Sequence, residues 1–137
     1  MSNYVYTSLN DPAAYYTIAN GINDRGQIVG WYKTSDMNQY YGFVYSGGKY
    51  TALDEPLAGS SLAFIYAQGI NDKGQVVGLY RDVSETIHGF LYSNDKYTTI
   101  DVPLASKTVA YGINNKGQIV GSYNDNSGSR RQIHDHR

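Results

Sequence analysis

Residues 21–30 read Gly-Ile-Asn-Asp-Arg-Gly-Gln-Ile-Val-Gly, and this stretch returns with small changes at 69–78 and at 112–121. The three copies are offset by 48 and 43 residues. Self-similarity at such a period is typical of stacked repeats, in which each copy is one supersecondary unit. The sequence therefore predicts one structural unit that occurs about three times. Each copy is followed, after one residue, by a tyrosine: Tyr32, Tyr80 and Tyr123.

Two further blocks recur behind the first one, in the same order. Gly-Phe-Val-Tyr at 42–45 matches Gly-Phe-Leu-Tyr at 89–92, and Tyr-Thr-Ala-Leu-Asp-Glu-Pro at 50–56 matches Tyr-Thr-Thr-Ile-Asp-Val-Pro at 97–103. A third version of the last block, Tyr-Thr-Ser-Leu-Asn-Asp-Pro, stands at 6–12. We therefore expect the chain to start in the middle of a repeat.

These blocks divide a single repeat domain, 1–137, into units of approximately 13–56, 57–103 and 104–137. The last unit ends in Arg-Arg-Gln-Ile-His-Asp-His-Arg at 130–137, where a Gly-Phe-Val-Tyr-like strand would be expected. Within this aberrant end we interpret His134-Asp135-His136 as a frayed polar tail. The last unit is expected to be completed by strand 3–12, which would cover an open sheet edge.

Turn chemistry divides each unit into four short strands. Asn-Asp-Arg-Gly at 23–26 and Asn-Asp-Lys-Gly at 71–74 tolerate positive φ, as tight hairpins require. The segments at 46–49 and 93–96 have the same character, so an antiparallel meander of four strands is predicted. The third copy of the first turn carries no carboxylate. These Asx residues are therefore expected to bond their own backbone rather than calcium.

The fold class is all-β, and two architectures fit units of this size. In a β-propeller blade both faces of the sheet are covered, which suits the mixed run Gln-Ile-Val-Gly-Trp-Tyr at 27–32. The alternative is a β-trefoil, whose natural count is three. Because three blades are fewer than propellers usually have, the propeller interpretation predicts a homo-oligomer, with a dimer that completes a six-bladed ring as the leading version.

Composition excludes several classes of partner. The chain has 11 Lys plus Arg against 12 Asp plus Glu, so no net positive field favours nucleic acid or an anionic membrane. It has no apolar run of about 18 residues, and we expect no signal peptide, because Met1–Tyr6 lack a basic region followed by an apolar stretch. The absence of cysteine leaves its compartment undecided. The 15 Tyr and 15 Gly suit pleated sheets joined by tight turns.

The three blocks together, Gly-Ile-Asn-Asp-x-Gly-Gln-Ile-Val-Gly-x-Tyr, His-Gly-Phe-Leu-Tyr and Tyr-Thr-Thr-Ile-Asp-Val-Pro, resemble the HAF-type bacterial tandem repeat family. The resemblance extends over residues 15 to 123, with the signature written as Tyr-Gly-Phe at 41–43 and His-Gly-Phe at 88–90. It implies tandem arrays in bacterial proteins that are often extracellular or on the cell surface, with no established enzymatic role. It supplies no catalytic residue.

Positions that differ between units are better site candidates than positions that recur, because the fold needs the recurring ones in every unit. Trp31 stands where the other units have Leu79 and Ser122. The ligand-binding candidates are Trp31, Tyr41, Arg81 and His88, with packing as the competing interpretation for each. His134 and His136 resemble a metal pair, but no third ligand is evident, so neither a metal nor a cofactor is predicted.

No arrangement of Ser, His and Asp has the setting of a catalytic nucleophile, and no glycine-rich loop leads into a phosphate-binding helix. We therefore expect a non-enzymatic binding or interaction module with a carbohydrate or protein ligand, since aromatic rings stack on sugars and anchor partners. The alternatives are a structural repeat segment of a bacterial surface protein and a hydrolase with an unrecognised site.

Overall fold

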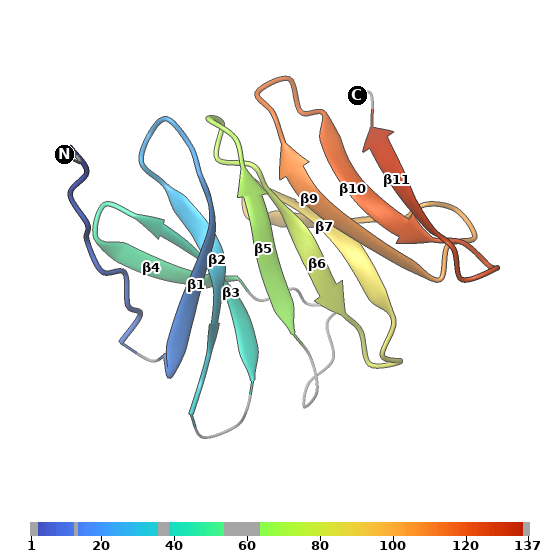
Figure 1. Cartoon of the computed structure of the whole chain (residues 1–137), viewed down its shortest axis with the longest axis horizontal. Helices are drawn as coiled ribbons and strands as arrows, with labels where there is room; N and C mark the ends of the chain where they lie inside the picture. Colours follow the sequence, from blue (N-terminus) through green and yellow to red (C-terminus); the bar gives the residue numbers. More distant parts are fainter. Residues whose placement is uncertain (1–2, 13, 36–38, 54–63, 136–137) are drawn as a thin grey trace.

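The computed structural model describes residues 3–12, 14–35, 39–53 and 64–135, and these form eleven β-strands and no helix (Figure 1). The strands are β1 (Tyr16–Ile22), β2 (Ile28–Lys33), β3 (Tyr40–Ser46), β4 (Lys49–Leu53), β5 (Ile65–Ile70), β6 (Val76–Arg81), β7 (Ile87–Ser93), β8 (Lys96–Ile100), β9 (Lys107–Ile113), β10 (Ile119–Asn124) and β11 (Arg130–Asp135). The described part of the chain contains no helix that could cross a membrane.

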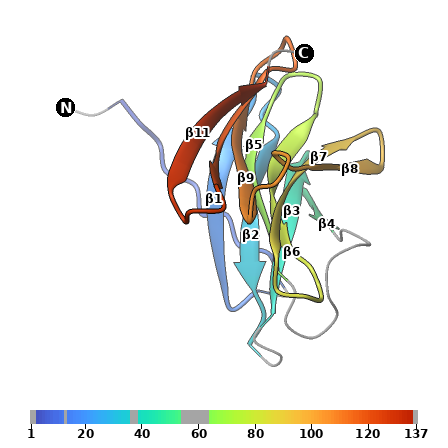
Figure 2. The ribbon, with the colours of Figure 1, turned by 90° about the vertical axis from the view of Figure 1, so that its right-hand side faces the viewer.

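Each repeat folds into a sheet of its own. The first sheet has the order β1-β2-β3-β4, the second β5-β6-β7-β8, and the third β9-β10-β11, with antiparallel pairing throughout. The predicted all-β class and the meander of four strands are confirmed for the first two units. Equivalent strands occupy equivalent places, and Figure 2 shows β4 and β8 on the same side of the molecule.

The pairing register is the same in all three sheets, and glycine is one cause. Gly30 pairs with Phe43, Gly78 with Phe90, and Gly121 with Ile133. A Cβ atom at Gly30 would lie 1.9 Å from the backbone oxygen of Ile18, because the neighbouring strand has a bulge there. The glycine that ends each ten-residue block is therefore required for close approach of the backbone.

Consecutive sheets pack face to face. The face of the first sheet that is directed toward the second, here called its C-side face, contributes Val29 and Leu53 to a core that also contains Ile65 and Val76. The opposite face of each sheet is called its N-side face. The N-side face of the third sheet meets the second sheet in a smaller core built around Val77, Ala110 and Ile119. The core of the protein therefore lies between the sheets, which stand in a row (Figure 1).

The hairpin turns that join β1 to β2, β5 to β6 and β9 to β10 lie along one side of this row (Figure 1). Within the first turn, Asn23 Oδ1 accepts hydrogen bonds from the backbone of Arg25 and Gln27. Asn71 and Asn114 do the same in their own turns. The expectation that Asx residues of these turns bond their own backbone is confirmed for Asn23, Asn71 and Asn114.

The same asparagines also connect neighbouring units, which the sequence did not indicate. Asn23 Nδ2 donates to the carbonyl of Asn71 at 2.9 Å, and Asn71 Nδ2 donates to the carbonyl of Asn114 at 2.9 Å. In parallel, the Asp24 amide donates to Asp72 Oδ1, and the Asp72 amide donates to Asn115 Oδ1. We call this series of bonds the turn ladder, because each turn donates to the next one along the chain.

The end of the chain corrects one prediction. His134 and Asp135, interpreted as part of a frayed tail, belong to β11 (Arg130–Asp135), in which His134 pairs with Val120. The loop before β11 is closed by a bond from the Asp125 amide to the Ser129 carbonyl, as the Asp82 amide bonds Thr86 in the second unit. A turn of the same shape therefore starts β11 in the register of β7.

The expected completion of the third sheet by residues 3–12 is not seen within this single chain. Residues 3–12 contain no described strand, and the third sheet consists of three described strands. The segment lies beside the first sheet, at the opposite end of the row from β11 (Figure 1). A short segment tied to β1 does not reach β11 of its own chain across this row.

Candidate functional site

A group of aromatic side chains surrounds Trp31 at the junction of the first and second sheets. The Trp31 ring stacks on Tyr66 with centroids 4.8 Å apart and an interplanar angle of 30°. Tyr16 meets the indole edge at 5.7 Å, and Tyr40 lies 5.6 Å from it. Phe64 stacks on the other side of Tyr66 at 4.9 Å. These five rings form the Trp31 cluster.

Two cations border the Trp31 cluster. The Arg81 guanidinium lies 4.8 Å from the Phe64 ring centroid, and Lys33 Nζ lies 5.9 Å from Tyr16 and 5.7 Å from Tyr40. Each contact has the geometry of a cation–π interaction. The cluster therefore combines flat apolar faces with donors of hydrogen bonds at its margin.

Strand pairing explains why these residues meet. Lys33 pairs with Tyr16 on one side and with Tyr40 on the other, next to Trp31 on β2. A single parallel bridge joins Tyr40 to Phe64, just before β5, and thereby links the two sheets. Residues of both units are thus held at one junction by backbone hydrogen bonds.

The Trp31 cluster is partly accessible to solvent. Tyr16 is 39 % exposed, and Trp31, Tyr40, Phe64 and Tyr66 are half-buried. Burial, together with the neighbouring tyrosines Tyr40 and Tyr16, raises the pKa of Tyr66. Its hydroxyl therefore stays protonated at neutral pH and can both donate and accept a hydrogen bond.

His88 occupies a different environment, on β7. Its Nε2 lies 2.7 Å from Asp82 Oδ2, its Nδ1 lies 2.7 Å from Asp101 Oδ2, and its ring stacks on Tyr80. Burial acts to lower the pKa of His88, but the hydrogen bonds to Asp82 and Asp101 outweigh burial and raise the pKa above its ordinary value. Both ring nitrogens are engaged, so His88 ties the β6–β7 loop to the end of β8.

Tyr41 is the counterpart of His88 in the first unit. It pairs with Tyr32 and stacks on it at 5.4 Å, as His88 stacks on Tyr80. Its hydroxyl hydrogen bonds to Gln39. Because Tyr32 follows Trp31 in the strand, Tyr41 lies on the opposite face of the sheet from Trp31. Of the four predicted site residues, Trp31 therefore lies in the Trp31 cluster and Arg81 borders it, whereas Tyr41 and His88 do not join it.

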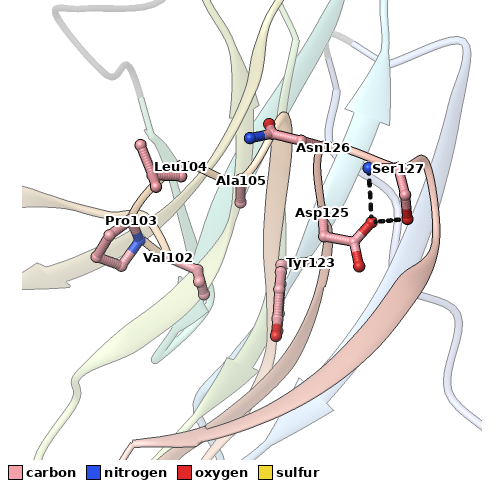
Figure 3. A pocket seen from close by; sticks show the side chains of 8 residues that line it. All are labelled: Val102, Pro103, Leu104, Ala105, Tyr123, Asp125, Asn126 and Ser127. Atoms are coloured by element: carbon pink, nitrogen blue, oxygen red, sulfur yellow. Dashed lines mark hydrogen bonds between the residues drawn. The ribbon is translucent and has the colours of Figure 1, made fainter.

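In the third unit, the position of Tyr41 and His88 is occupied by Arg131. Arg131 pairs with Tyr123 and places its Nε 3.2 Å from Asp125 Oδ2. Asp125 also accepts hydrogen bonds from Ser127 (Figure 3) and from the Ser129 amide. These bonds, first of all that from the Ser127 hydroxyl, lower the pKa of Asp125 to about 2. One position thus holds the loop between the second and third strands of each unit described here, through a different contact in each. Tyr41 bonds Gln39, His88 bonds Asp82, and Arg131 bonds Asp125.

A hollow of about 450 Å³ lies between the β8–β9 link and this third loop (Figure 3). It is lined by Val102, Pro103, Leu104, Ala105, Tyr123, Asp125, Asn126 and Ser127. Figure 3 shows Asp125 bonded to Ser127 within its own loop. The hollow is open to solvent, and its one carboxylate, Asp125, is already bonded to Ser127, Ser129 and Arg131.

Within the described ranges, no group of three or more His, Cys, Asp or Glu could hold a metal ion, and His136 lies outside those ranges. No family model, curated protein or solved structure matches this chain.

Comparison of the repeats by sequence identified Trp31 and Arg81 but missed the residues that surround them. Tyr66 stands where the other units have Ile18 and Val109, and Phe64 stands where they have Tyr16 and Lys107. The same test of divergence that selected Trp31 would have selected these positions. Their meeting across two sheets could not be deduced from divergence alone.

Proposed function

We propose that this chain is a non-enzymatic binding module of β-propeller-type repeats that recognises a carbohydrate at the Trp31 cluster. The observation that carries this proposal is the cluster itself: five aromatic rings and two cations, half-exposed, gathered from two units. At the equivalent junction of the second and third units, Leu79 and Val109 replace Trp31 and Tyr66. The fold does not need this cluster, because the second junction forms without it.

Carbohydrate is the ligand class that best suits this chemistry. The apolar face of a pyranose ring stacks on aromatic rings, and its hydroxyl groups need hydrogen-bond partners at the margin. Tyr66 and Tyr16 hydroxyls, Lys33 and Arg81 supply such groups beside Trp31. The near-neutral net charge of the chain favours a neutral ligand over a polyanion.

The propeller interpretation is preferred over the trefoil on the pairing pattern. In a trefoil, strands from different units share one barrel, whereas here each unit pairs within its own sheet and the sheets stack face to face. Four-stranded antiparallel sheets that pack on one another are the arrangement expected for propeller blades, which supports this part of the proposal. The resemblance to HAF-type repeats belongs to the same proposal, as does an extracellular or surface location.

Trp31 is the only tryptophan in the chain, so its fluorescence reports directly on the proposed site. We expect saturable changes in emission when a panel of neutral oligosaccharides is titrated into the protein. Trp31→Leu, which installs the residue of the second unit, should weaken binding of the selected sugar at least about tenfold, a loss of about 1.4 kcal/mol, when measured by calorimetry.

Tyr41→Leu is the matched control, because Tyr41 lies on the opposite face of the same sheet. It should leave sugar affinity unchanged. The proposal would be wrong if no sugar of a broad panel changed Trp31 emission, or if both variants lost affinity equally.

A structural repeat segment is the second candidate, and the turn ladder favours it. The bonds from Asn23 to Asn71 and from Asn71 to Asn114 recur in every junction, as expected for a scaffold that is extended unit by unit. Under this alternative, Trp31→Leu would alter only stability.

A further inference from the structure

The two end sheets each leave one face open, and the open faces correspond to the two halves of the interface inside the chain. Val29 and Val77 are fully buried on the C-side faces of the first and second sheets, whereas Val120, their counterpart in the third, is 49 % exposed. On the N-side faces, Ile70 is 8 % exposed and its counterpart Ile22 is 67 % exposed. The third sheet thus leaves its C-side face open, which is the face on which a following sheet would pack. The first sheet leaves its N-side face open, which is the face that would pack on a preceding sheet.

The backbone shows the same pattern. A Cβ atom at Gly21 would lie 3.3 Å from Gly69 Cα, and one at Gly69 would lie 3.1 Å from Gly112 Cα, because the inner strands approach closely there. A Cβ atom at Gly112 would lie near only the side chain of Val120, which belongs to the same sheet, and near no strand of a following sheet among the described residues. Asn23, Asn71 and Asn114 each donate from Nδ2 to a glutamine of their own turn. The turn ladder ends at Asn114, because the described residues contain no following turn to which its Nδ2 could also donate.

A strand is also available for the third sheet. Residues 6–12 repeat the sequence of β4 and β8, which pair with β3 and β7 as fourth strands. Tyr4, Val5 and Tyr6 are 80 %, 92 % and 87 % exposed. A run of exposed apolar residues with strand propensity is typical of a segment that pairs elsewhere.

The edge that this strand fits is β11. Ile133 on β11 is half-buried, although its counterparts Phe43 and Phe90 are fully buried beside β4 and β8. In the described chain the Thr17 hydroxyl is buried without a partner, whereas its counterpart Thr108 accepts a bond from the Val102 amide at 3.1 Å. Asp11 is the counterpart of Val102, so residues 6–12 placed as a fourth strand would supply the missing donor to Thr17.

We propose that two copies of this chain associate head to tail, with the first sheet of each copy packed on the third sheet of the other. Residues 6–9 of each copy then add to β11 of the other as its fourth strand. The register follows from the repeats: Gly42 pairs with Leu53 and Val44 with Thr51, so Gln132 pairs with Leu9 and His134 with Thr7. The second copy is the occupant because the interface continues one that the chain already forms twice within itself.

One departure of this interface from the repeat is at Gln132. Gln132 stands where the other units have Gly42 and Gly89. A Cβ atom at Gly42 would lie 3.2 Å from the Ile65 side chain, and one at Gly89 would lie 2.8 Å from the Ile100 oxygen. Gln132 therefore crowds the added strand, and Gln132→Gly should tighten the association.

Disulfide trapping tests the proposal directly, because the chain has no cysteine of its own. Thr7→Cys and His134→Cys are prepared as separate single variants, mixed and oxidised. Opposite residues of an antiparallel pair have Cβ atoms about 4.5–5.5 Å apart, near the distance that a disulfide spans. We expect a covalent heterodimer of twice 15.2 kDa.

The control shifts the register by one residue. Ser8→Cys mixed with His134→Cys should not crosslink, because a slip of one residue turns the side chain to the other face. Equal crosslinking of both pairs would overturn the register. A Thr7→Cys, His134→Cys double variant that forms a disulfide within one monomer would overturn the exchange between copies.

A second variant separates this inference from the proposed ligand. Val120→Glu places a charge on the open C-side face without touching the Trp31 cluster. We expect sedimentation equilibrium to give a dimer for the original chain and a 15.2 kDa monomer for Val120→Glu, with sugar binding unchanged. A monomeric original chain would overturn the association and leave the proposed function standing.

Discussion

The second sheet and the two end sheets are built from nearly the same residues, yet they differ in what covers them. The second sheet is covered on both faces, and Val76 and Val77, adjacent residues that point to opposite faces, are both fully buried. In the third sheet the adjacent pair is divided, since Ile119 is fully buried and Val120 is 49 % exposed. The comparison teaches that each repeat encodes two interfaces, and that the end units each leave one of them unused within the chain.

The turn ladder gives the largest contrast between the second and third units. Asn71 is buried and takes part in bonds with Lys73, Gln75 and Asn114. Asn71→Ala should lower the free energy of unfolding by about 3 kcal/mol, because several buried polar groups lose their partner. Asn114→Ala removes only the bonds within one exposed turn and should cost about 1 kcal/mol.

Urea unfolding of both variants at low protein concentration measures this difference. Equal losses would show that the bond from Asn71 to the next turn adds nothing to stability.

The apolar faces give the second contrast. Val77→Ala removes two buried methyl groups between the second and third sheets and should cost about 2 kcal/mol. Val120→Ala should change the stability of the monomer by less than about 0.5 kcal/mol, because its side chain is half-exposed there. The same unfolding experiment checks both values, and a large loss for Val120→Ala in a monomer would mean that its face is already covered.

The smallest effect concerns His88, which the second unit has in place of Tyr41 and Arg131. Its pKa should lie above about 6.5, the ordinary value for histidine, in a titration followed by NMR. Its contribution to stability is therefore fully present below that ordinary value and is lost as the pH rises through the raised pKa of the folded state.

Asp82→Asn should lower the pKa of His88 while it keeps the side-chain oxygen that accepts the Ser84 and Thr86 amides. Asp125→Asn, the equivalent change in the third unit, should leave the pKa of His88 where it was. An unchanged pKa of His88 in the Asp82→Asn variant would contradict the hydrogen bond between His88 and Asp82.

The strands of the first two units could be predicted because their turns are specified locally. Gly26 and Gly74 adopt the positive φ that the motif implied, and Asn94 and Asp95 do so in the second type of turn. β11 was missed because Arg130–Asp135 lacks the Gly-Phe pair of its counterparts. The signal that could have found it is the polar loop at 125–129, which closes as the loop at 82–86 does.

The candidate site was predictable only in part. Divergence between repeats singled out Trp31 and Arg81, but Tyr66 and Phe64 come from another sheet, and their position depends on how the sheets pack. The turn ladder could not be predicted for a similar reason. The sequence shows an asparagine in each turn, and only the stacking of units places its amide beside the next carbonyl.

Amide hydrogen exchange in the monomeric Val120→Glu variant tests the central claim most directly, namely that equivalent turns are closed by the unit that follows them. The amides of Asp24 and Asp72 donate to the next turn, at 2.7 Å and 2.8 Å, whereas Asn115 has no following turn among the described residues. We predict slowed exchange at Asp24 and Asp72 and fast exchange at Asn115. Equal rates at all three positions would contradict the account.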